Sequence, residues 1–130
     1  MTSTKFAFGV DDVAEALIPI LRQVDEENVV FVTGIDDDGF PRDSECFTSP
    51  DKPLSSLPVD LLFHLPQSQD LPAVVVTSRT HGESEDSIVE FTRGLIEAGH
   101  RVGVEVLDHL CVDDTGHRQL RTTTNLWAEK

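Results

Sequence analysis

Residues 103–112 read Gly-Val-Glu-Val-Leu-Asp-His-Leu-Cys-Val, and this stretch decides the fold. A nearly unbroken apolar run of this length is typical of a strand that is buried on both faces. Only Asp108 and His109 interrupt its apolar second half. Adjacent residues of a strand point to opposite faces, so these two side chains should not form a dyad with each other. The run therefore predicts a buried strand over residues 102–112 that carries a structural Asp-His pair.

The segments on either side of this strand also show clear periodicity. Ser84 is placed to cap a helix of about 15 residues, and Gly99 is placed to end it. The apolar residues of this helix recur at helical spacing and predict its buried stripe: Ile88, Phe91, Leu95 and Ile96. After the strand, residues 113–116 predict a hairpin turn and residues 117–123 a last strand.

The first part of the chain predicts a hairpin and a third strand. Residues 28–35 and 40–48 have strand character, and Gly39 suits the turn between them. The unbroken apolar run 72–77 predicts the central strand of the sheet.

Three short helical or irregular segments complete the predicted order. Pro58 should begin a short helix, and Pro66 should stop it. Asp11 or Asp12 should cap a helix that runs to about residue 23, with residues 1–10 disordered before it. The resulting order of helices and strands predicts one α/β domain over residues 1–130 with a mixed sheet.

Composition narrows the class of protein further. The 130 residues carry a net charge of −14, which argues against direct nucleic-acid binding and favours basic partners. No apolar run approaches the ~18 residues of a membrane span, and the N-terminus lacks the pattern of a signal peptide. These features predict a cytoplasmic protein that does not bind membranes.

The order and spacing of these segments resemble the JAB/MPN metalloprotease-like domain of RadC proteins. The most specific match is Val106-Leu107-Asp108-His109. The segment Phe91-Thr92-Arg93-Gly94-Leu95 and the strand at residues 73–77 match in the same order. The resemblance covers roughly residues 27–120 and implies a cytidine-deaminase-like α-β-α sandwich.

Active members of that family hold zinc through His-x-His, followed by Ser-x-x-Asp, with a glutamate as general base. The resemblance places Glu45 at the glutamate. It places Thr77 and Arg79 at the two histidines, where neither is a suitable zinc ligand. Counting forward from Thr77 puts the serine and aspartate at Ser87 and Glu90. Counting back from residues 108–109 puts them at Glu85 and Ile88 instead.

Two roles are open for the polar residues around these positions. His81, Glu83 and Asp86, together with Glu45, could hold a divalent ion if the loop folds inward, and zinc is the cofactor in that case. Otherwise no cofactor is expected, and Arg79 takes the place of the metal. Arg79 would then form an ion pair with Glu45 or Asp86, or bind an anionic group of a partner.

Three functions therefore follow from the sequence. The first is a non-catalytic binding or scaffold module that engages a protein partner, or a second copy, near residues 77–86. The second is a metal-dependent peptidase or isopeptidase with a rebuilt ligand set. The third is a role linked to DNA repair, implied by the resemblance alone. The loss of both histidine positions favours the first.

Overall fold

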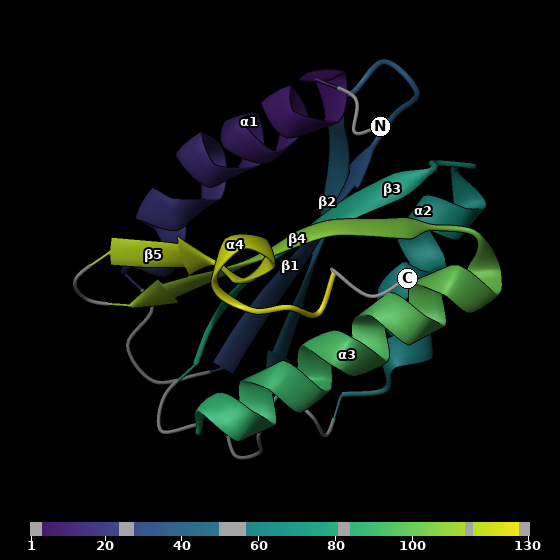
Figure 1. Cartoon of the computed structure of the whole chain (residues 1–130). Helices are drawn as coiled ribbons and strands as arrows, with labels where there is room; N and C mark the ends of the chain where they lie inside the picture. The colour runs from purple at the N-terminus through teal and green to yellow at the C-terminus, as the bar shows by residue number, and fades with distance from the viewer. Residues whose placement is uncertain (1–3, 24–27, 50–56, 81–83, 114–115, 128–130) are drawn as a thin grey trace.

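The computed structural model describes residues 4–23, 28–49, 57–80, 84–113 and 116–127 (Figure 1). Within them, five strands form one mixed sheet in the order β2-β1-β3-β4-β5. The strands are β1 (Asn28–Ile35), β2 (Pro41–Ser49), β3 (Ala73–Arg79), β4 (Glu105–Asp113) and β5 (Gly116–Gln119). Only β3 and β4 pair in parallel, and the other neighbours are antiparallel. The predicted α/β class with a mixed sheet is confirmed.

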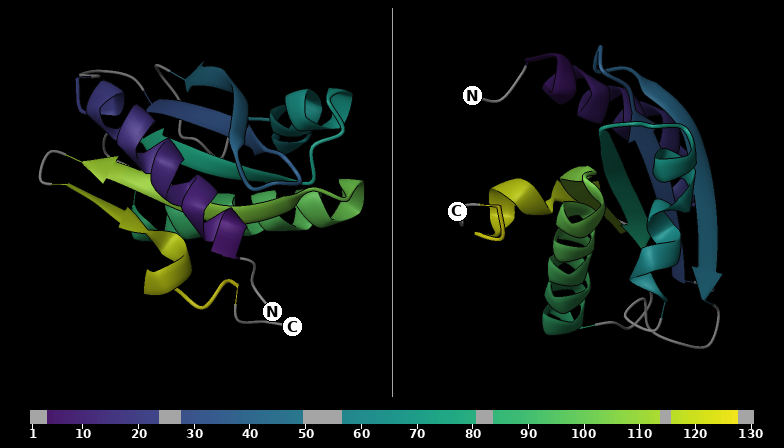
Figure 2. Two further views of the ribbon diagram at one scale, coloured as in Figure 1. Left: turned by 90° about the horizontal axis from the view of Figure 1, so that it is seen from above. Right: turned by 90° about the vertical axis from the view of Figure 1, so that its right-hand side faces the viewer.

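Helices cover both faces of the sheet (Figure 2). The helical elements are α1 (Thr4–Leu21), the 3₁₀ helix η2 (Val59–Phe63), α2 (His64–Ser68), α3 (Glu85–Val102) and α4 (Leu120–Thr123). Buried residues of α1 pack against one face of the sheet. Buried residues of α3 and η2 pack against the opposite face. Every residue of β3 is buried, which agrees with its unbroken apolar sequence.

The β1–β2 hairpin forms as its sequence predicts. Asp36 accepts hydrogen bonds from the backbone N–H groups of Asp38 and Phe40, at 2.9 and 3.0 Å. Gly39 adopts a φ of 88°, a conformation that glycine adopts without strain. The turn is therefore held both by its aspartate and by its glycine.

The first helix begins earlier than its sequence predicts. It starts at Thr4 instead of Asp11 or Asp12. Val10, Val13 and Leu17 lie at helical spacing and are buried in one cluster, so burial extends the helix toward its N-terminus. Pro19 lies inside the helix and does not end it.

The helix α3 extends past its predicted end at Gly99. It continues to Val102, and Gly103 ends it with a φ of 78°. Gly99 is instead a point of close contact: a Cβ atom at this position would lie 2.3 Å from the carbonyl oxygen of Val104. The chain needs a glycine here because β4 enters the sheet directly against the helix.

Two other predicted boundaries also differ. Pro66 does not stop the helix at residues 64–68; it lies buried within α2. The last strand ends at Gln119 instead of residue 123, and α4 follows directly. The strand ends there because Asp108 accepts a hydrogen bond from the backbone N–H of Arg121 at 3.0 Å, which turns the chain away from the sheet.

None of the helices in the described part of the chain is both long enough and apolar enough to cross a bilayer.

Candidate functional site

The two histidine positions of the resemblance fall at the carboxyl end of β3, inside the protein. Thr77 and Ser78 are 0% exposed and Arg79 is 6% exposed. Thr77 lies opposite Phe31 and Arg79 opposite Val29, and both partners pack on the α1 side of the sheet. Thr77 and Arg79 therefore face α1, whereas Ser78 faces α3.

Ser78 belongs to a buried chain of hydrogen bonds that joins three elements. Its Oγ lies 2.6 Å from Nε2 of His109 on β4. Nδ1 of His109 lies 2.7 Å from Oγ1 of Thr92 on α3. Thr92 in turn donates to the carbonyl oxygen of Ile88 at 2.8 Å. We call Ser78, Thr92 and His109 the polar core triad; all three are buried, in an otherwise apolar interior.

These bonds fix the tautomer of His109. Thr92 has one hydroxyl hydrogen, which the carbonyl of Ile88 accepts, so Nδ1 of His109 must donate to Thr92. Nε2 is then the acceptor, and the Ser78 hydroxyl donates to it. Burial lowers the pKa of His109 to about 3, and the positive charge of Arg118 acts in the same direction. His109 is therefore neutral at physiological pH.

Asp108 has partners different from those of its neighbour His109. One oxygen, Oδ1, accepts from the backbone N–H groups of His109 and Arg121, at 2.7 and 3.0 Å. The other, Oδ2, accepts from the side-chain amide of Gln119 at 3.2 Å. Burial raises the pKa of Asp108, although these hydrogen bonds oppose the rise. The carboxylate holds the junction between β5 and α4 and makes no side-chain bond to the imidazole.

An ion pair and a thiol lie beside the polar core triad. Arg118 on β5 donates two hydrogen bonds to Glu85 in the first turn of α3, one of them 3.2 Å long. Sγ of Cys111 lies 3.9 Å from Oγ of Ser78. Burial raises the pKa of the Cys111 thiol to about 11, so the thiol is protonated and is a poor nucleophile.

Glu45, the candidate general base, lies on the other side of the sheet from Thr77 and Arg79. It pairs with Val32, which packs in the core under α3. Its Oε1 atom is buried and accepts no hydrogen bond within the described residues. The predicted ion pair between Glu45 and Arg79 is wrong, because the two side chains leave the sheet on opposite faces.

The remaining candidate positions lie on α3 or outside the described residues. Asp86 and Glu90 are exposed on α3, and Glu90 binds Arg93 at 2.7 Å. Ser87 donates its backbone N–H to the Oγ of Ser84, which caps the helix as predicted. His81 and Glu83 lie outside the described residues.

The side chains of Thr77 and Arg79, at the two histidine positions, do not suit zinc. Threonine offers a neutral hydroxyl and arginine a fixed cation where the family has imidazoles. Within the described residues, no three His, Cys, Asp or Glu side chains are grouped closely enough to hold a metal ion.

Thr92 and Ser78 were not among the residues that the sequence singled out as site candidates. The signal for Thr92 was its position on the stripe of Ile88, Phe91 and Leu95, where an apolar side chain is expected. A polar residue at such a position needs a buried partner. His109, a polar residue inside an apolar strand, is that partner.

No protein-family model matches the chain. A search of curated proteins also finds no match.

Proposed function

We propose that this chain is a non-catalytic domain of the JAB/MPN type that works as a binding or scaffold module. The observation that carries the proposal is the polar core triad. At the end of β3, Thr77 and Arg79 hold the positions of the metal ligands and face α1, whereas Ser78 between them bonds inward to His109 on the other side of the sheet. A reaction centre requires groups that a substrate can reach, and all three members of the triad are buried.

Electrostatics supports the same proposal. The neutral His109 has both ring nitrogens occupied by hydroxyl groups, so neither is available to a substrate or a metal. Cys111, the thiol closest to the triad, holds its proton at physiological pH. These groups stabilise the junction of β3, β4 and α3, and a stable junction is what a scaffold requires.

The zinc content of the purified protein tests this proposal against the metal-dependent hydrolase. The chain should be produced in zinc-supplemented medium and purified without a polyhistidine tag or chelator. We expect far less than one zinc per chain by elemental analysis. We also expect an unchanged melting temperature after dialysis against EDTA, because structural metal would contribute to folding.

Two variants make the result decisive. About one zinc per chain in the parent, lost in His81→Ala and kept in His64→Ala, would refute the proposal and support a rebuilt site. His64 is the matched control because it lies exposed at the start of α2.

A further inference from the structure

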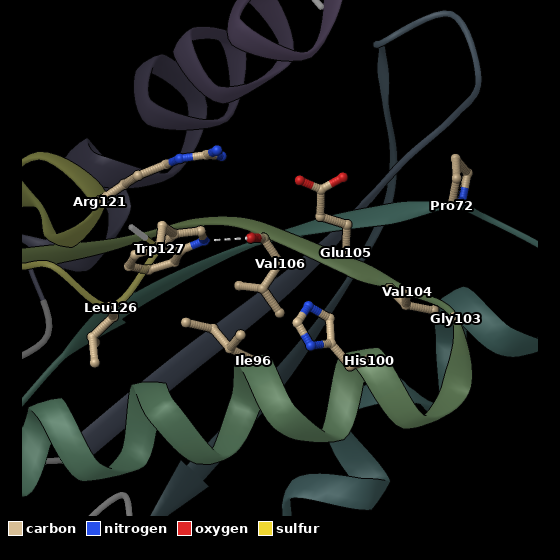
Figure 3. Close-up of a pocket in the computed structure, with 11 residues that line it drawn as sticks. Pro72, Ile96, His100, Gly103, Val104, Glu105, Val106, Arg121, Leu126 and Trp127 are labelled. Carbon is tan, nitrogen blue, oxygen red and sulfur yellow. Dashed lines mark hydrogen bonds between the residues drawn. The ribbon is translucent and has the colours of Figure 1, made fainter. Parts of the chain in front are cut away.

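A groove runs along the C-terminal half of α3, at the end of the helix away from the polar core triad. Its central hollow has a volume of about 450 Å³ and lies between α3, the start of β4 and the C-terminal segment (Figure 3). A second hollow of about 270 Å³ adjoins it toward Arg93 and shares Ile96, His100 and Leu126. A third of about 330 Å³ adjoins it at Pro72, Gly103 and Val104.

Two apolar side chains of this groove, Ile96 and Trp127, are held in place. Trp127 donates its indole N–H to the carbonyl oxygen of Val106 at 2.7 Å, which fixes the ring beside β4 (Figure 3). Ile96 and Trp127 pack partly buried against the core under α3. Side chains held in place before a ligand arrives lower the ordering cost of binding.

The positive charges beside the groove are already engaged. Arg93 pairs with Glu90 at 2.7 Å. Arg121, which lines the central hollow, donates Nη1–H to the carbonyl oxygen of Leu107 at 2.9 Å; this bond orients the guanidinium but leaves its charge in place. Within the described residues, neither contact involves an acidic side chain that lines the groove.

The negative charges beside the groove have no such partners. Glu97, Glu105 and Asp70 are exposed, and none of them forms an ion pair or a side-chain hydrogen bond within the described residues. The C-terminal end of α3 adds partial negative charge at Val102 and Gly103. The whole chain, at −14, attracts cations from a distance.

We propose that this groove binds a linear peptide segment in which an apolar anchor is flanked by lysine or arginine. The anchor would contact Ile96 and Trp127, and the basic side chains would face Glu97, Glu105 and Asp70. From Arg93 to Gly103 the helix extends about 15 Å, which is the length of about five residues of extended chain. The inference rests on the proposed binding function and names the class of partner.

The chain contains its own reporter of this site. Trp127 is its only tryptophan, and it has no tyrosine, so intrinsic fluorescence reports on the groove alone. The probes are two octapeptide pools without aromatic residues. One has leucine or isoleucine at the centre and lysine or arginine at the flanks, and the other has aspartate or glutamate at the flanks. At about 0.15 M salt, we expect the basic pool to change the fluorescence saturably and the acidic pool to leave it unchanged.

Two charge reversals of equal size locate the site. Glu105→Lys and Glu15→Lys change the net charge equally, but Glu105 lines the central hollow, whereas Glu15 lies exposed on α1 and lines none of the three hollows. We expect Glu105→Lys to weaken binding of the basic pool by about tenfold, and Glu15→Lys by less than about twofold. Ile96→Gln should also weaken binding, while circular dichroism confirms that it is folded.

Three results of the peptide titrations would overturn the inference. They are no response to the basic pool, equal responses to both pools, and equal weakening by the two charge reversals. Dimer formation that Ile96→Gln abolishes, without a response to the basic pool, would also overturn it by assigning the groove to a second copy. Each of these results can occur in zinc-free protein, so they do not depend on the zinc measurement that tests the proposed function.

Discussion

His109 is the residue whose surroundings are most unusual for its type. Its ring is 0% exposed and lies edge-on to Phe91, with ring centroids 5.9 Å apart. A buried imidazole avoids a desolvation cost only while it is neutral and both nitrogens are hydrogen-bonded. Ser78 and Thr92 meet that requirement, so the triad is stable only while His109 carries no charge.

The stability of the protein should therefore depend on pH through His109. Its folded pKa of about 3 lies below the ordinary value of 6.5, so the unfolded chain takes up a proton that the folded chain does not. This contribution is complete above about pH 6.5 and is lost as pH falls toward 3. In urea unfolding, we expect the free energy of unfolding to fall by up to about 1 kcal/mol per pH unit in this window.

A non-titrating substitution isolates this effect. His109→Gln should be less stable than the parent at pH 7.5 and should have a shallower decline between pH 6.5 and 5. His100→Gln, at an exposed position on α3, should keep the parental slope. A parental slope in His109→Gln would show that other groups cause the acid sensitivity.

At the scale of elements, the contact between α3 and β4 depends on one glycine. Gly99 allows the carbonyl oxygen of Val104 to approach the helix, and Val104 donates its N–H back to the carbonyl of Gly99 at 2.9 Å. The ring of Phe63 from η2 closes the other side, 3.4 Å from the position of a Cβ atom. The packing of Val104 and Phe63 against α3 thus determines how its C-terminal end is built.

We expect Gly99→Ala to destabilise the protein although alanine favours helix. The added methyl would lie 2.3 Å from backbone, so β4 or α3 must shift, at a cost of roughly 2–3 kcal/mol. Gly94→Ala in the same helix is the control, because its nearest neighbour, a methyl of Val59, would be 3.9 Å away. That variant should be neutral or up to about 1 kcal/mol more stable.

Thermal or urea unfolding of the two variants measures the difference. Equal stabilities would mean that the close contact between Gly99 and Val104 relaxes without cost.

At the scale of the whole molecule, α3 separates two polar regions with different roles. The polar core triad lies toward its N-terminal half, where it is sealed from solvent. The groove lies along its C-terminal half and opens to solvent beside exposed carboxylates. His109→Gln should therefore leave peptide binding unchanged, and Glu105→Lys should leave the pH dependence of stability unchanged.

Net charge makes a prediction about nucleic acid at this same scale. A chain of −14 repels phosphates, so we expect no submicromolar binding to a duplex of about 20 base pairs at about 0.15 M salt. Fluorescence anisotropy with a labelled duplex measures this, and a basic DNA-binding protein serves as the positive control. Submicromolar affinity that decreases steeply with salt would support the repair-linked function instead.

Much of the fold could be predicted from the sequence because its signals are local. The strand at residues 28–35 depends on a continuous apolar run, and the N-cap of α3 on a serine before acidic residues. The turn at residues 36–39 depends on an aspartate and a glycine. These features arise between residues that are close in the chain, so their spacing alone predicts them.

What only the tertiary structure decided is which distant groups meet. Ser78 and His109 are 31 positions apart, and Thr92 and His109 are 17 apart, so no local pattern joins them into one triad. Glu45 and Arg79 lie on opposite faces of the sheet, because the register of each strand determines the face that each side chain occupies. The sequence by itself determined the middle of most helices and strands through local periodicity, but not the start of α1 or the end of β5. Packing between elements decided that α3 continues past Gly99 and which polar groups are buried in the core. Both outcomes depend on contacts between residues that are distant in the chain.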